Sequence, residues 1–273
     1  LTFLAGCETH SHHDEHSHSV DHSHVTMTVK GGQRCITSDG VPDHAWGPWR
    51  EGATVEPQDH NFCMDASPEL TGTITRNARI SGVTVTGIPL RPGTAEYYDA
   101  TSDRGYSRDP SSGWNVEGIG GLIMDAQNAH VDGSGYYHYH GIPSAVTGAL
   151  NGTLFGYAAD GFEIHYLGDA AKSSYQLKQG ERPSSPGPGG QHDGTYVQDY
   201  QYVAGSGTLD ECNGTMRDGQ YVYYATDTYP FFPRCFKGTV SNDFIAGRGE
   251  RPEGGRDGER PPRGERPPRP DRG

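Results

Sequence analysis

The residues best suited to chemistry are Tyr137-His138-Tyr139-His140, near the end of a segment that spans 128–143. Successive side chains of a β-strand point to opposite faces, so a strand here places both imidazoles on one face and both phenol rings on the other. Two neutral imidazoles held side by side are part of a preformed transition-metal site. Alternatively, the two histidines face water or hydrogen-bond backbone carbonyls.

A third imidazole, His130, precedes the turn sequence Asp132-Gly133-Ser134-Gly135. This turn predicts a hairpin that places His130 on the strand paired with His138 and His140. Three converging imidazoles would form a metal site that keeps positions open for water or substrate.

Asp210 and Glu211 are the second group of candidate ligands. They precede Cys212, and a disulfide there would hold their loop rigid. The preferred geometry is one pocket containing His138, His140 and Asp210 or Glu211. Imidazole ligands favour Zn or Cu, whereas added carboxylates favour Mn, Fe or Ca.

Composition indicates the fold that must position these side chains. The chain has 273 residues, of which 32% are hydrophobic, and it contains 40 Gly, 19 Pro and 16 Tyr. Frequent turn residues and few long apolar runs predict a mainly β fold with few short helices, either β-sandwich-like or mixed. We expect a single domain over residues 25–245.

Alternating β-branched and aromatic residues predict individual strands, and Asp160-Gly161 predicts a hairpin turn. A short helix is expected over 144–150. The predicted strand regions are 25–29, a hairpin of 72–80 with 83–88, a hairpin over 154–167, 196–203 and 221–226.

Several blocks in fixed order carry a family resemblance. They are ITSDGVPDH (36–44), DAQNAHVDGSGYYHYHGIP (125–143), GYAADGFEIHYLG (156–168), SSYQLKQGERP (173–183), HDGTYVQDYQYVAGSGTLDECNGT (192–215) and YPFFPRCF (229–236). Over about 36–236 the chain resembles the YHYH-domain family, which takes its name from the tetrapeptide at 137–140. The resemblance implies an architecture and candidate sites rather than a reaction.

Four cysteines beyond Cys7 favour an exported, oxidising location. They allow three pairings, of which the most local joins Cys35 to Cys63 and Cys212 to Cys235. No CxxC pair is present, so neither a zinc ribbon nor a thioredoxin-type site is indicated.

The N-terminal region predicts a lipid anchor. Leu4-Ala5-Gly6-Cys7 has the form of a bacterial lipobox, which makes residues 1–7 the end of a signal peptide and Cys7 the acylated, palmitate-bearing residue. We therefore expect a lipoprotein on the exported side of a bacterial cell envelope, in the outer membrane, the periplasm or the cell surface. Alternatively, Cys7 is a free cysteine.

Two flanking segments are too polar to fold by themselves. Residues 8–24 form a tether expected to gather metal ions or to act only as a spacer. Residues 246–273 form an Arg/Pro/Gly/Glu tail that either contacts a cell-envelope polymer or is a solvated linker. The tether histidines are His10, His12, His13, His16, His18, His22 and His24.

A formal net charge of −13 argues against binding to nucleic acid. The preferred function is an envelope-anchored lipoprotein with a metal site on the YHYH strand. One alternative is a glycan or cell-wall recognition module that uses its tyrosines for stacking, with the histidines structural. Another is a metal-dependent hydrolase, for which Asp160 and Glu163 near His165 offer acid–base groups.

Overall fold

In the computed structural model, which describes residues 25–245, short β-strands dominate and three brief α-helices occur. The strands are Thr26–Lys30 (β1), Gln33–Ser38 (β2), His60–Asp65 (β3), Gly82–Thr84 (β4), Pro89–Leu90 (β5), Tyr97–Tyr98 (β6), Tyr106–Ser107 (β7), Ala129–Val131 (β8), Tyr137–Tyr139 (β9), Leu154–Ala158 (β10), Glu163–Tyr166 (β11), Tyr175–Leu177 (β12), Tyr200–Tyr202 (β13), Gly214–Arg217 (β14) and Gln220–Ala225 (β15). The helices are Gly118–Gly121 (α1), Ser144–Ala149 (α2) and Asn242–Ile245 (α3), and 3-10 turns span Pro110–Ser112, Gly168–Ala170 and Val197–Asp199.

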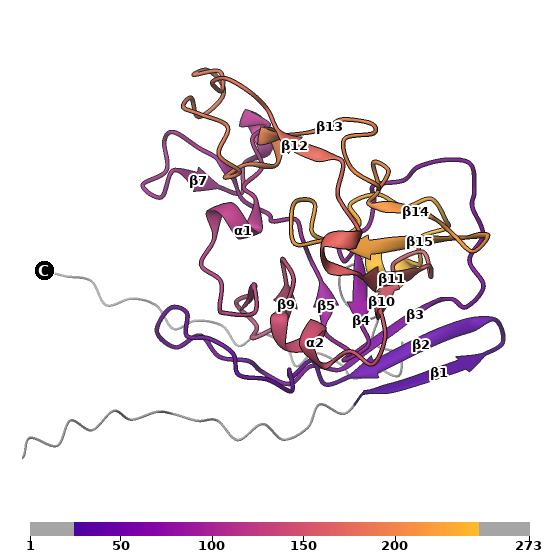
Figure 1. Cartoon of the computed structure of the whole chain (residues 1–273). Helices are drawn as coiled ribbons and strands as arrows, with labels where there is room; N and C mark the ends of the chain where they lie inside the picture. The colour runs from indigo at the N-terminus through magenta and orange to yellow at the C-terminus, as the bar shows by residue number, and fades with distance from the viewer. Residues whose placement is uncertain (1–24, 246–273) are drawn as a thin grey trace, which may run out of the picture.

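The main sheet has the strand order β14-β15-β11-β10-β4-β5-β9-β8 (Figure 1). Most neighbours are antiparallel, but β5 with β9 and β11 with β15 are parallel. Smaller sheets are formed by β1-β2-β3, β6-β7 and β12-β13. The hairpin β8–β9 therefore lies at one edge of the main sheet.

The three-stranded sheet packs against the main sheet through a shared apolar core. In β3 the side chains of Phe62 and Met64 are buried, whereas Asn61 and Asp65 are exposed, as expected for a strand with one face on the core. Phe62 and Met64 belong to the same buried cluster as Val83 of the main sheet. The two sheets therefore share one core.

Two disulfides cross-link separate parts of this fold. Cys35 and Cys63 are opposite each other in the β2–β3 ladder and are bonded. Cys212, in the loop before β14, is bonded to Cys235. The most local pairing is therefore confirmed.

The predicted mainly β fold with few short helices is confirmed. Strands lie at 26–30, 154–158, 163–166 and 220–225, and α2 occupies the region predicted to be helical. The region 196–203 begins as a 3-10 turn and becomes a strand only at β13.

The predicted strand over 72–80 is wrong. Its backbone pairs with the C-terminal part of the domain, where Thr75 exchanges hydrogen bonds with Phe236 and Ile80 N donates to the Phe244 carbonyl. The hairpin lies further along the chain, between β4 and β5. A local pattern could not show a partner about 160 residues away.

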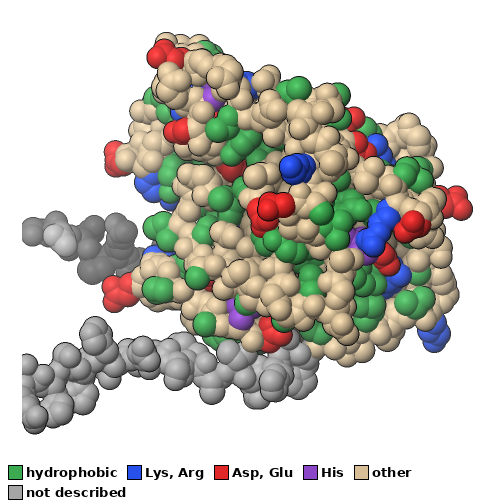
Figure 2. Space-filling model, in the orientation of Figure 1, with side chains coloured by type: hydrophobic (Ala, Val, Ile, Leu, Met, Phe, Trp, Pro, Cys, Tyr) green, Lys and Arg blue, Asp and Glu red, His purple; other side chains and the backbone are tan. Residues whose placement is uncertain are grey.

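Charged side chains of both signs are mixed on the face shown in Figure 2. Within the described residues, no helix has the length and apolar character needed to span a membrane. The predictions for the lipobox with Cys7, the tether histidines of 8–24 and the tail 246–273 concern residues outside the described range.

Candidate metal centre

The β8–β9 hairpin brings the first two histidines together. His130 lies directly opposite His138 in the antiparallel ladder. Asp132 holds the turn because its Oδ1 accepts hydrogen bonds from Ser134 N at 2.9 Å and Ser134 Oγ at 2.6 Å. The sequence-based placement of His130 across the hairpin is therefore correct.

The three imidazoles meet at their Nε2 atoms. His130 Nε2 lies 3.1 Å from His138 Nε2 and 3.2 Å from His140 Nε2. In the described residues, one group of three or more His, Cys, Asp or Glu side chains is close enough to hold an ion, and it consists of these three histidines. Two nitrogens bound tetrahedrally to zinc at about 2.0–2.1 Å lie about 3.3 Å apart, so the spacing suits a metal.

The hydrogen bond of His138 aims its lone pair at this meeting point. Its Nδ1 lies 3.0 Å from the Tyr136 carbonyl oxygen, which can only accept, so Nδ1 carries the proton in the neutral ring. Nε2 then has a free lone pair. A carbonyl partner of this kind orients many metal-binding histidines.

His140 is positioned by close packing with Gly118, the first residue of α1. A Cβ atom on Gly118 would lie 2.7 Å from Cγ of the His140 ring and would overlap Nδ1. Only glycine leaves room for the ring in this position. Gly118 therefore positions His140 without contacting the meeting point of the Nε2 atoms.

Burial keeps these imidazoles neutral. Desolvation, together with the positive charge of Arg91, lowers the pKa of His130 to about 4. Desolvation also holds the pKa values of His138 and His140 well below the usual range. A neutral imidazole is the form that binds metal.

The phenol rings on the opposite face of β9 anchor the strand. Tyr137 donates a 2.9 Å hydrogen bond to Asp125 Oδ2. The Tyr139 hydroxyl lies 2.5 Å from His44 Nε2, and His44 Nδ1 lies 3.0 Å from the Ala45 carbonyl. His44 thus supports a tyrosine of the motif.

Asp210 and Glu211 do not join the histidines. Asp210 Oδ2 accepts hydrogen bonds from Tyr221 at 2.8 Å and Lys237 Nζ at 2.5 Å. Glu211 forms an exposed ion pair with Arg76 at 3.1 Å. These carboxylates fix the loop beside the second disulfide, so the predicted mixed pocket is not formed.

The acid–base candidates are also engaged elsewhere. Buried Asp160 accepts a 2.7 Å hydrogen bond from Tyr223. Glu163 Oε2 lies 2.8 Å from His165 Nε2, and both residues belong to β11. None of the three lines the cavity in front of the histidine group.

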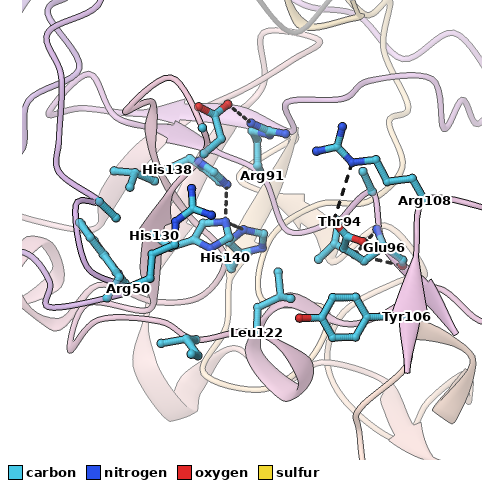
Figure 3. A pocket seen from close by; sticks show the side chains of 18 of the residues that line it. Arg50, Arg91, Thr94, Glu96, Tyr106, Arg108, Leu122, His130, His138 and His140 are labelled. Carbon is cyan, nitrogen blue, oxygen red and sulfur yellow. Dashed lines mark hydrogen bonds and ion pairs between the residues drawn. The ribbon is translucent and has the colours of Figure 1, made fainter. Parts of the chain in front are cut away.

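A cavity of about 370 Å³ opens in front of the three histidines. Figure 3 shows Arg91 and Arg50 beside the imidazoles, with Arg108, Glu96 and Tyr106 across the space. Arg91 reaches this place because it follows β5, whose neighbour is β9, and its backbone N–H donates to the Tyr139 carbonyl at 2.9 Å.

The chain belongs to the YHYH protein family, whose family model matches residues 61–238. Neither the curated proteins nor the solved structures provide a match to the chain.

Proposed function

We propose that the YHYH domain binds one divalent transition-metal ion through the Nε2 atoms of His130, His138 and His140. Zn²⁺ is the first candidate and Cu²⁺ the second, because both accept imidazole ligands. The convergence of three neutral, buried imidazoles, with Nε2 separations of 3.1 and 3.2 Å, carries this proposal.

The open cavity favours a metal site that can bind a further ligand over a purely structural metal site. Structural zinc sites usually have four protein ligands, whereas sites with three protein ligands leave a position for water or substrate. Metal-dependent hydrolysis, in which the ion activates water, is therefore the second candidate function. A glycan-binding face has less support, since many of the candidate tyrosines are buried in the core.

We further propose that the protein works in an exported, oxidising compartment of a bacterial envelope. The two disulfides support this location. Attachment to lipid through Cys7 and metal delivery by the segment 8–24 belong to the same proposal. The variant Cys7→Ser should lose palmitate labelling and membrane association. Unchanged labelling would refute lipid attachment at Cys7.

Metal stoichiometry tests the centre. In a tether variant, the seven histidines of residues 8–24 are replaced by Asn, which removes competing imidazoles without shortening the chain. After dialysis against Zn²⁺ and desalting, elemental analysis should find one zinc per chain.

Adding His130→Ala to the tether variant should remove the bound zinc, because two imidazoles are left. His165→Ala is the matched control, as it deletes an imidazole outside the group, and zinc should remain. Absence of zinc from the tether variant, or equal loss in both alanine variants, would refute the proposed centre.

A further inference from the structure

The cavity in front of the histidines concentrates positive charge in a chain whose formal net charge is −13. Its lining includes Arg50, Arg91, Arg104 and Arg108. Fixed charges of one sign in a recessed site raise the local concentration of the opposite ion. These guanidinium groups therefore favour the binding of an anionic ligand.

The carboxylates of the cavity compensate only part of this charge. Asp132 lies 3.6 Å from Arg91, and Glu96 lies 3.8 Å from Arg108. In the described part of the chain, no carboxylate lies within ion-pair distance of Arg50 or Arg104. Arg104 instead stacks over Tyr106, with 4.8 Å between its Cζ and the ring centroid.

The least exposed of these guanidinium groups is next to the imidazoles. The Arg91 side chain is only 15% exposed, and its charge acts on all three histidines. Buried charge is costly unless it is paired, and the Asp132 carboxylate that pairs with Arg91 is itself 39% exposed. A metal ion held by three neutral imidazoles would keep its double charge and add to that of Arg91.

We propose that this cavity binds a phosphate group, as free phosphate or as a phosphate monoester, through Arg50, Arg91 and Arg104. A phosphate group carries about 1.5 to 2 negative charges at neutral pH, which matches the two unpaired arginines better than one carboxylate does. Guanidinium groups also bind phosphate oxygens through paired, charge-assisted hydrogen bonds. One feature of this inference rests on the proposed function: a phosphate oxygen would occupy the open coordination position of the metal.

Titration calorimetry on the full-length tether variant, which lacks the competing imidazoles of residues 8–24, tests the assignment, with glycerol 2-phosphate, inorganic phosphate and acetate as probes. Zinc-loaded and chelator-treated protein are compared. Both phosphate probes should bind the zinc-loaded protein more tightly than acetate. Binding of inorganic phosphate alone would identify the free ion as the ligand, and binding of both would admit monoesters.

Arg50→Gln/Arg104→Gln should weaken phosphate binding by about tenfold or more, because both exposed guanidinium groups leave the cavity. Arg76→Gln/Arg217→Gln removes the same charge outside the cavity and should leave affinity within about twofold. Equal weakening in the two pairs, acetate binding as tight as phosphate, or no phosphate binding to zinc-loaded protein would overturn the proposal. Zinc content measured in the same samples reports separately on the proposed metal centre.

Discussion

A single glycine controls the orientation of the most buried imidazole in the histidine group. Gly118 lies against the His140 ring, and its missing side chain provides the space for that ring. The three Nε2 atoms meet only if His140 keeps this orientation. The centre thus depends on a residue that has no ligand atom of its own.

Gly118→Ala is expected to weaken zinc binding by about 10–100-fold, the size of effect seen when a ligand-orienting partner is lost. The added methyl group would displace the His140 ring. Competition with a chromophoric chelator, with each substitution made in the tether variant, measures the affinity. Gly148→Ala is the control, since a Cβ there meets no atom within 4 Å, and it should bind zinc like the original chain. Equal affinity of the two variants would contradict the role of Gly118.

His60 provides a pH-dependent contribution to stability that is separate from the metal. Desolvation lowers its folded-state pKa to about 4 from 6.5, although Asp39 and Asp59 partly oppose this. Between these values the unfolded chain binds a proton that the folded chain does not bind. The contribution is therefore complete above pH 6.5 and is lost as the pH falls toward 4.

Replacing His60 by Gln should flatten the pH dependence of the unfolding free energy between pH 6.5 and 4. The difference over that range should be on the order of 3 kcal/mol, since each pKa unit corresponds to about 1.4 kcal/mol. Urea unfolding with chelator present measures it without interference from metal release. Parallel pH profiles of the two proteins would exclude this role of His60.

At the scale of elements, the site is a hairpin at a sheet edge, supported from both sides. The β8–β9 ladder fixes His130 against His138, and α1 supports His140. On the opposite face, Tyr137 and Tyr139 attach β9 to residues from other segments. The alternation of His and Tyr thus separates the proposed ligands from the residues that anchor the strand.

The second disulfide should stabilise the fold without affecting the centre. Cys212→Ala/Cys235→Ala opens a loop with a sequence separation of 23 residues, which should cost about 3 kcal/mol of unfolding free energy. In the tether variant carrying this change, zinc stoichiometry should remain at one, because the Asp210-Glu211 loop beside this bond contains none of the proposed ligands. Loss of zinc from the folded variant would show that the loop does contribute to the centre.

Local patterns predicted the hairpin well, because a four-residue turn between short strands determines which residues face each other. The predicted alternation of His138 with the tyrosines was also correct. The positions of Arg91 and Gly118 could not be predicted this way. They depend on the pairing of β5 with β9 and on the packing of α1, which join segments separated by other strands.

The error with Asp210 and Glu211 has a similar physical origin. Adjacent acidic residues beside a cysteine resemble a cation loop in sequence. In the folded chain Asp210 forms an ion pair with Lys237 and Glu211 forms one with Arg76, and both partners are distant in sequence. The arginines of the cavity could not be predicted from the net charge either, because a sum over the whole chain does not show where charges of one sign lie close together.

At the scale of the whole molecule, metal binding should stabilise the folded state, because the unfolded chain does not hold the three imidazoles together. Free zinc at about 100 times the dissociation constant should add roughly 2.7 kcal/mol. For a domain of this size the melting temperature should rise by about 5–10 °C. Calorimetry of the tether variant measures this shift, and His130→Ala should abolish it. A zinc-independent melting temperature in the tether variant would contradict the expectation.

Anomalous diffraction at the zinc edge from crystals of the zinc-loaded tether variant locates the metal relative to the three histidines. One anomalous peak is expected in each chain, about 2.0–2.1 Å from the Nε2 atoms of His130, His138 and His140. A fully loaded crystal with its zinc bound elsewhere, or with no peak between these imidazoles, would contradict metal binding by the three histidines.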